Sequence, residues 1–283
     1  MNIKIGKITR GLVLFLFVAC SQQEVQVPEQ RELKLAVVID NVARVGDTSF
    51  DLGDRVGVFV TCNQNGQEQL LMTSGNYADN RLFVNEADGL KTNAPVLYPL
   101  NRQDMVVYAY HPYRAELTTV AALPFVVEKD QREESHYKAS DFVWGRQKVD
   151  FDKVGEVSLA FAHCMSRVVI RLKAGTDIFS LTDAEVFIRN VRNEAKINLH
   201  GGSVSVGLDS ELVEIRPFQC TETEYEAIVP PQFVAAGDKF ITVRLGGKDY
   251  SYVVPAGGIS LVPGEERVFV LTLNDEDFNL GIK

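Results

Sequence analysis

The segment that most constrains the fold is residues 157–173, VSLAFAHCMSRVVIRLK. Its first seven residues alternate apolar side chains with small or polar ones, the period-two pattern of a strand with one buried face. After His163 the alternation continues, but its phase has slipped by one residue. A slip of this kind needs a bulge or a turn around Cys164 to Ser166. The segment therefore predicts two strands, or one sharply bent strand, near the middle of the chain.

Similar short apolar runs, separated by turn residues, recur along the 283 residues, of which 46% are hydrophobic. No segment shows the period of a long helix, so an all-β fold of the sandwich type is expected. The length fits one large or two ordinary domains. The polar stretch Asp150–Gly155 is where we place the boundary between two β-domains.

The expected strands share a period-two pattern or a short apolar run between turn signals. They are Leu33–Ile39, Arg55–Cys62, Ala94–Leu100 (a short edge strand, because it contains two prolines), Met105–Tyr110 (a central strand), Leu181–Ile188, Ala195–Leu199, Tyr225–Val229, Lys239–Leu245, Lys248–Val254 and Arg267–Leu273. Gly246-Gly247 predicts a hairpin between two of them. Residues 63–89 are expected to be irregular, and Glu128–Ser140 to be a charged loop.

The N-terminus has the pattern of a secretory signal. Residues 1–10 carry three basic residues and no acidic residue, and a short apolar run, Leu12–Ala19, ends at Cys20. This run is too short to span a bilayer as a stable helix. The end of the run resembles the lipobox of bacterial lipoproteins, which implies a lipid-modified Cys20 as the mature N-terminus. An ordinary cleaved signal with an incidental cysteine is the alternative, and residues 21–31 are expected to be a polar tether.

The formal net charge of −9 argues against a nucleic-acid partner, because such proteins bind phosphate largely through Lys and Arg. The remaining cysteines, Cys62, Cys164 and Cys220, form no CxxC pair, and the four histidines have no ligand spacing. The sequence thus predicts no metal and no cofactor. A Cys164–Cys220 disulfide stays open, and the phase of Cys62 suggests a buried side chain.

Two groups of residues have the types that catalysis or sugar binding would need. His163 lies close to Ser166, but no nucleophile-elbow pattern surrounds the serine, and structural roles are expected. A second group contains Tyr108, Tyr110, Tyr113 and Trp144, which could stack on a sugar but are expected to pack in the core. The chain is therefore not expected to be an enzyme.

Several motifs occur in an order that resembles the fimbrillin family, the lipoprotein-derived subunits of type V pili. They are FDLGDRVGVF (Phe50–Phe59), Tyr98-Pro99, VYAYHPY (Val107–Tyr113), SDFVWG (Ser140–Gly145), LAFAHCMSRVV (Leu159–Val169) and the turn Leu261–Gly264. The resemblance covers most of the chain. It implies two transthyretin-like β-sandwich domains in tandem, which we assign to residues 32–154 and 155–283, after a signal peptide over residues 1–20.

The resemblance also implies how such a chain assembles. Family members are exported as lipoproteins, trimmed by an arginine-directed protease and polymerised by exchange of strands. Here the removable strand would be Leu33–Ile39 and the processing site Arg44, with Arg31 and Arg55 as weaker rivals. Exchange of this kind is β-augmentation, in which a strand from another chain completes a sheet.

These implications lead to one expected function and one alternative. The first is a lipid-anchored subunit of a fimbria on the outer membrane, which joins other fimbrillin subunits by donor-strand exchange and serves adhesion to a host or bacterial surface. The tail Phe278–Lys283 is short and lacks the tryptophan common in donor segments, which favours a tip or accessory subunit. The alternative is a non-polymerising surface lipoprotein that binds a glycan or protein ligand.

Overall fold

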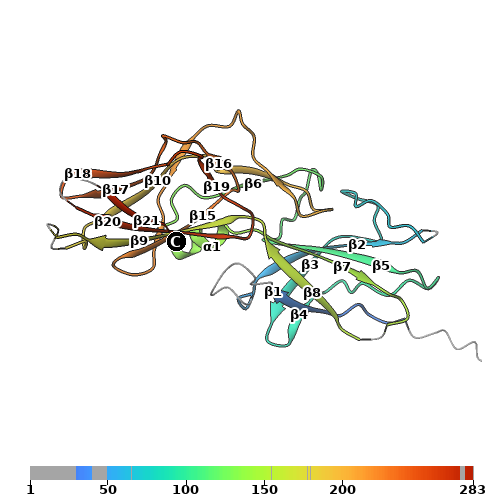
Figure 1. The fold of residues 1–283 in the computed structure, drawn as a ribbon. Helices are drawn as coiled ribbons and strands as arrows, with labels where there is room; N and C mark the ends of the chain where they lie inside the picture. Colours follow the sequence, from blue (N-terminus) through green and yellow to red (C-terminus); the bar gives the residue numbers. More distant parts are fainter. Residues whose placement is uncertain are drawn as a thin grey trace, which may run out of the picture. The chain divides into compact units, whose positions relative to one another are not determined.

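The computed structural model describes residues 30–39, 50–64, 66–153, 155–176, 178, 180–274 and 278–282. Strands dominate this part of the chain, and its one helix is the six-residue α1 (Glu134–Ala139) (Figure 1). The all-β class expected from the sequence is confirmed. Among these residues no helix has the length and apolar character needed to cross a membrane.

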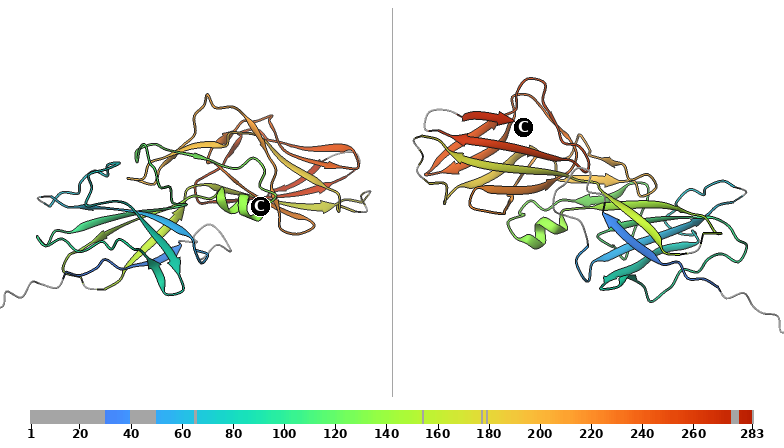
Figure 2. Two further views of the ribbon diagram at one scale, coloured as in Figure 1. Left: turned by 180° about the vertical axis from the view of Figure 1, so that it is seen from behind. Right: turned by 60° about the horizontal axis from the view of Figure 1, so that its bottom comes forward.

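The first sheet has seven strands and contains the N-terminal strand at one edge. Their order is β1 (Leu35–Ile39), β8 (Val157–His163), β7 (Val143–Val149), β5 (Met105–His111), β2 (Arg55–Cys62), β3 (Ala78–Glu86) and β4 (Gly89–Lys91). Strands β1 and β8 run parallel, whereas every other pair in this sheet is antiparallel. Figure 2 shows β1, in blue, beside β8, in yellow-green, at the edge of the sheet.

The rest of the described chain forms four smaller sheets. The five-stranded sheet has the order β14 (Phe218–Gln219), β15 (Glu224–Val229), β9 (Ser166–Ala174), β20 (Glu266–Leu273), β21 (Phe278–Ile282). The four-stranded sheet has the order β13 (Val213–Ile215), β10 (Glu185–Val191), β17 (Lys239–Leu245), β18 (Lys248–Val253). A three-stranded sheet contains β12 (Val204–Ser205), β11 (Glu194–Ile197) and β6 (Leu123–Val126), and a two-stranded sheet contains β16 (Phe233–Val234) and β19 (Ile259–Ser260). The Gly-Gly hairpin is confirmed, because β17 and β18 pair across Gly246 and Gly247, whose φ angles of 60° and 80° suit a tight hairpin turn.

The phase slip in the central segment marks the point where the chain passes from one sheet to another. Strand β8 ends at His163 and β9 begins at Ser166, as two strands were expected to do. The first belongs to the seven-stranded sheet and the second to the five-stranded sheet. Because the residues between them, Cys164 and Met165, are both buried, the joint is part of the core.

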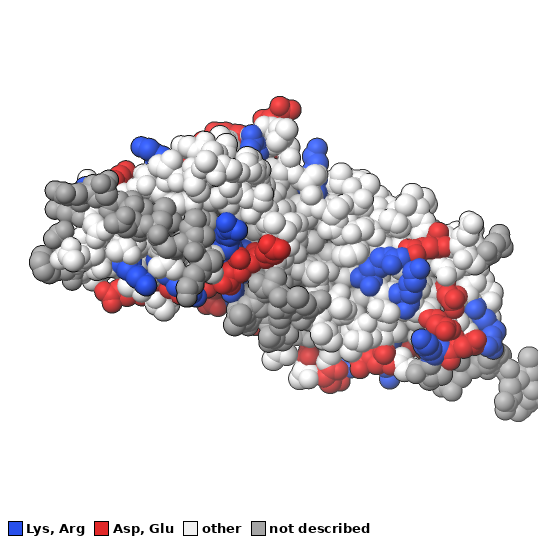
Figure 3. All heavy atoms as spheres, viewed as in Figure 1, with Lys and Arg blue, Asp and Glu red and all other residues white. Residues whose placement is uncertain are grey.

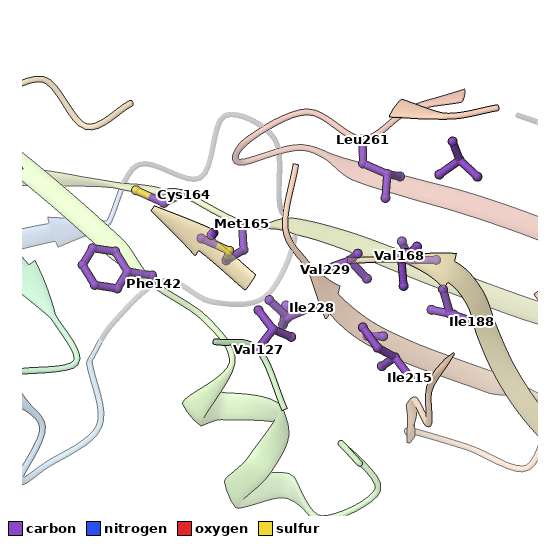
Figure 4. Close-up of a cluster of buried hydrophobic side chains, with 14 of the residues drawn as sticks. Val127, Phe142, Cys164, Met165, Val168, Ile188, Ile215, Ile228, Val229 and Leu261 are labelled. Carbon is purple, nitrogen blue, oxygen red and sulfur yellow. The ribbon is translucent and has the colours of Figure 1, made fainter. Parts of the chain in front are cut away.

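Two buried apolar clusters hold the sheets, and the seven-stranded sheet contributes to both. On β5, Val107 belongs to one cluster and Tyr108 to the other, so this strand is buried on both faces, as expected for a central strand. We call the cluster that contains Leu33, Leu35 and Val107 the β1 cluster. The larger cluster includes Tyr108 and the residues drawn in Figure 4.

Sheet membership does not follow a boundary at residue 154. Strand β8 lies after that residue yet pairs with β7, and β6 lies before it yet pairs with β11. Residues 31–283 form one compact unit. A boundary drawn between the two largest sheets falls at the joint Cys164–Met165, and the division into two transthyretin-like domains stays a prediction.

Three expectations about single segments were wrong. Strand β3 lies inside the region expected to be irregular; only Ala78 and Phe83 on it are buried, so its apolar pattern is weak. The charged loop contains α1, where Glu134 and Lys138 form an i,i+4 ion pair of 3.0 Å that supports a helical turn. Residues 94–100 form no named strand and contribute only an isolated bridge from Leu97.

Candidate functional site

The N-terminal strand has the alternation of a half-buried strand. Leu33 and Leu35 are each 1% exposed and belong to the β1 cluster, and Val37 packs against it. Between them Lys34 is exposed, and Val38 is 52% exposed. Burying a leucine side chain contributes roughly 1.5–3 kcal/mol, so the two leucines supply much of the attachment of this segment.

The backbone of the segment has different neighbours along its length. Near its start, the amide of Leu33 donates to the carbonyl of Val96 at 2.7 Å, and the amide of Tyr98 donates to the carbonyl of Arg31 at 2.8 Å. From Leu35 onward the segment pairs only with β8, in a register that joins Leu35 to Val157. Strand β1 is therefore an edge strand whose removal would expose one side of β8.

The side chain of Arg31 fastens the beginning of the segment. Its guanidinium donates to the carbonyl of Phe151 at 2.6 Å and lies 4.5 Å from the centre of the Tyr98 ring and 4.9 Å from that of Phe151. Cation–π contacts of this kind contribute about 0.5–1 kcal/mol at exposed sites. Because Arg31 is held in this way, it is a poorer protease substrate than an arginine in an open loop.

A cavity of about 220 Å³ lies beside β1, lined by Leu33 and Leu35 together with Phe83 and Leu90. Its rim carries both signs of charge, from Lys91 and Glu156 among others. Most of the lining residues are polar, and Leu33 and Leu35 are each 1% exposed, so the cavity is a surface hollow beside the strand rather than a void in the β1 cluster.

The two predicted site residues, Cys20 and Arg44, lie outside the described residues, so lipid attachment and processing stay predictions. Arg44 falls in the stretch 40–49, between β1 and Phe50. Its rival Arg55 is the first residue of β2, with its guanidinium 5.1 Å from the Tyr113 ring centre. The pairing of β1 with β8 was not predicted from the sequence. The alternation of residues 157–161 indicates a strand there but does not indicate its partner.

The pair His163 and Ser166 has structural roles, as expected. The hydroxyl of Ser166 donates to the carbonyl of Val262 at 2.5 Å. Nδ1 of His163 lies 2.6 Å from a carboxylate oxygen of Asp141. Since the serine proton is held by a main-chain carbonyl and the residue is 1% exposed, Ser166 is not placed as a nucleophile.

The aromatic group is divided by the structure. Tyr108 and Tyr110 are each 1% exposed and pack in the core, as expected. Trp144 is only half-buried, and its indole donates to the carbonyl of Leu199 at 2.7 Å. The aromatic side chains therefore do not form one exposed platform.

The cysteines in the described part of the chain all carry thiols, with no disulfide among them, so the Cys164–Cys220 pairing is absent. Cys62 is buried as expected, and burial raises its pKa to about 11. The described residues contain no group of three metal-ligating side chains. On the face in Figure 3, Lys and Arg lie beside Asp and Glu rather than in one basic area.

The fold occurs in solved structures of adhesion and fimbrial proteins from Bacteroides. A "putative cell adhesion protein" from Bacteroides uniformis superposes with a TM-score of 0.69 at 20% identity, covering 89% of this chain and 96% of that one. A "putative cell adhesion protein" from Bacteroides ovatus superposes with a TM-score of 0.71 at 16% identity, covering 90% of this chain and 96% of that one. A "fimbrial protein" from Bacteroides ovatus superposes with a TM-score of 0.54 at 18% identity, covering 85% of this chain and 48% of that one. These structures define an all-β class of fold found in cell-surface adhesion and fimbrial proteins.

A family model described as "Fimbrillin-like" matches residues 43–283, and the chain belongs to this family. A curated relative, the "Putative fimbrium tip subunit Fim1C" of Bacteroides ovatus, is 23% identical over 200 residues, 62% of this chain. The matched chain spans 35% of that relative's length. Membership of this fimbrillin-like family indicates a cell-surface location.

Proposed function

We propose that this protein is a fimbrial subunit or accessory protein that accepts a strand from another subunit in place of β1. The observation that carries the proposal is the edge position of β1, which has a single neighbouring strand, contains the buried Leu35 and follows the buried Leu33. The strand is followed directly by the stretch that contains Arg44. Cleavage after Arg44 would break the covalent link between β1 and the rest of the chain, so that only non-covalent contacts would hold the strand.

Loss of β1 would leave a groove with a defined chemistry. The exposed side of β8 would offer main-chain hydrogen bonds worth about 1 kcal/mol each. The sites of Leu33 and Leu35 would accept alternate apolar side chains, so that an extended strand with period-two hydrophobicity fits. Since an open sheet edge above an exposed cluster is unfavourable in water, occupation by another chain is the stable outcome.

The C-terminal strand is the segment of this chain best placed to act as a donor. Strand β21 lies at the edge of the five-stranded sheet and pairs only with β20. Donation would require β21 to leave β20. A tip subunit, by contrast, would keep β21 in its own sheet and use only its accepting groove.

We further propose that Cys20 carries the lipid that anchors the protein to the outer membrane. Two or more acyl chains on one residue give firm attachment, whereas one chain gives only marginal binding. Cys20→Ser should abolish incorporation of a labelled fatty acid. Incorporation into the Cys20→Ser protein at the level of the unchanged protein would refute the assignment.

The processing step is tested with an arginine-specific protease acting on the purified protein. We expect cleavage after Arg44, seen by mass spectrometry, followed by oligomers that resist mild heating in detergent. Arg44→Gln should remain intact and monomeric, while the matched control Arg55→Gln should behave like the unchanged protein. Monomers that persist after complete cleavage would disprove assembly with copies of the same chain, and failure of the cleaved protein to bind a peptide of the sequence Leu33–Ile39 would disprove strand acceptance.

A further inference from the structure

A second open cavity has a volume of about 580 Å³, and its lining residues are distant in sequence from β1. It is lined by Glu68, Leu70, Trp144, Arg146, His200 and Gly201, and we call it the Trp144 pocket. Its residues come from three places: the connection between β2 and β3, strand β7, and the loop after β11. The volume falls in the range of pockets that bind small organic ligands.

The indole of Trp144 is fixed in position rather than mobile. Its Nε1–H donates to the carbonyl of Leu199. Gly202 packs directly against the ring, because a Cβ added at this position would lie 2.3 Å from the ring carbon Cε3. The glycine has a φ of +71°, which a residue with a side chain rarely adopts. The rest of the ring is available to the pocket, since Trp144 is half-buried.

A carboxylate and a guanidinium form the polar wall of the pocket. Both carboxylate oxygens of Glu68 accept from Nη2 of Arg146, and Oε1 also accepts from the Tyr108 hydroxyl at 2.7 Å. Burial raises the pKa of Glu68, but these donors outweigh it and lower the pKa overall. Glu68 is therefore a carboxylate, and its Oε2, with Lys148 at 3.7 Å, keeps room for another donor.

Two side chains complete the set. The Arg146 guanidinium lines the pocket and donates to Glu68 through Nη2. The amide of Leu71 donates to Nδ1 of His200 at 3.5 Å, and the Tyr108 hydroxyl lies 3.4 Å from the same nitrogen. The His200 ring lies 5.6 Å from that of Tyr108, which holds it in place.

We propose that the Trp144 pocket binds a neutral sugar ring. The C–H face of a pyranose carries slight positive charge and packs on the negative face of an indole. Each sugar hydroxyl both donates and accepts, and the pocket offers a carboxylate, a guanidinium and an imidazole. Because Glu68 is paired with Arg146, and Lys148 does not line the pocket, we expect a neutral sugar to bind better than an anion. This inference does not depend on the exchange of β1.

The test uses the fluorescence of Trp144, which is the only tryptophan in the chain. The full-length protein is titrated with maltose, cellobiose, lactose and mannobiose. We expect a saturable change in emission with at least one of them. Arg146→Ala and His200→Ala should each weaken that binding about tenfold or more, as loss of a hydrogen bond to a charged or buried partner does.

The matched control is Phe233→Ala, which truncates an aromatic side chain that is 60% exposed and does not line the pocket. It should bind as the unchanged protein does, and circular dichroism establishes that each variant is folded. Should one pocket variant not fold, the other still decides the question. No saturable response to any of the four sugars, or equal affinity in folded pocket variants, would overturn the proposal. Tighter binding of sialyllactose than of lactose would overturn the neutral class.

Discussion

Strand β1 has five residues and strand β9 has nine, and the two are held in different ways. Strand β9 has a neighbour on each side, β15 antiparallel and β20 parallel, whereas β1 pairs only with β8. On β9, Val168, Val169 and Ile170 are at most 1% exposed, while Val38 of β1 is half in solvent. The comparison suggests that β9 cannot leave without global unfolding, but β1 can.

A buried charge on β9 should give the largest effect. Val168→Asp places an uncompensated carboxylate in the larger cluster, where Val168 is fully buried, and we expect no cooperative unfolding transition in urea. Val38→Asp on β1 should change the free energy of unfolding by less than about 0.5 kcal/mol. Equal effects of the two substitutions would remove the distinction between the strands.

The ion pairs of β9 should give the next largest effect. The Arg167 guanidinium is buried, donates to Glu266 at 3.0 Å from Nε, and lies 3.6 Å from Glu226. Arg167→Ala should lower the free energy of unfolding by about 3 kcal/mol, because it leaves the partly buried Glu266 carboxylate without this partner, while Glu226 keeps the Tyr137 hydroxyl as a donor. Arg31→Ala should cost only about 1 kcal/mol, since its main contacts are cation–π. Urea denaturation measures both.

Truncation of a leucine on β1 should separate local from global loosening. Leu35→Ala is expected to cost about 2–5 kcal/mol in the attachment of β1. Hydrogen exchange should then accelerate in residues 33–38 but not in β9. In the matched control, Ile170→Ala, exchange should accelerate throughout the larger cluster. Uniform acceleration by Leu35→Ala would mean that β1 is not an independent unit.

The smallest effect concerns thiol reactivity. Because burial raises the pKa of Cys62 from 9.0 to about 11, its thiolate fraction at pH 8 falls about 100-fold and alkylation should be slow. Cys62 belongs to the β1 cluster and Cys164 to the larger one. Removal of residues up to Arg44 should accelerate alkylation of Cys62 but not of Cys164. Equal acceleration, followed by mass spectrometry, would show that both clusters open.

The sequence predicted those elements whose side chains alternate strongly. Strand β2 and the β17–β18 hairpin follow from apolar periodicity and a Gly-Gly turn, and the break after His163 follows from a phase slip. Strand β3 was missed because its polar residues face solvent on one side and its alternation is weak. Pairing partners also could not be read locally, because β1 and β8 are more than a hundred residues apart.

The two sites differ in the same way. The strand that we propose to be removable was predicted from the family resemblance, because an apolar run followed by an arginine is continuous in sequence. The Trp144 pocket joins Glu68, Trp144 and His200 from three distant segments, and only Trp144 had been noted. Tyr108 was expected to pack in the core and does so, and its hydroxyl donates to Glu68 of the pocket.

The two-residue joint between β8 and β9 has a mechanical consequence. A strand seated beside β8 and pulled along the fibre would shear the β8 ladder, in which many hydrogen bonds share the load at once. The tension would then pass through Cys164 and Met165 into β9, which is hydrogen-bonded to a strand on each side. Because no long loop separates β8 from β9, the connection between the seven-stranded and the five-stranded sheet would be stiff.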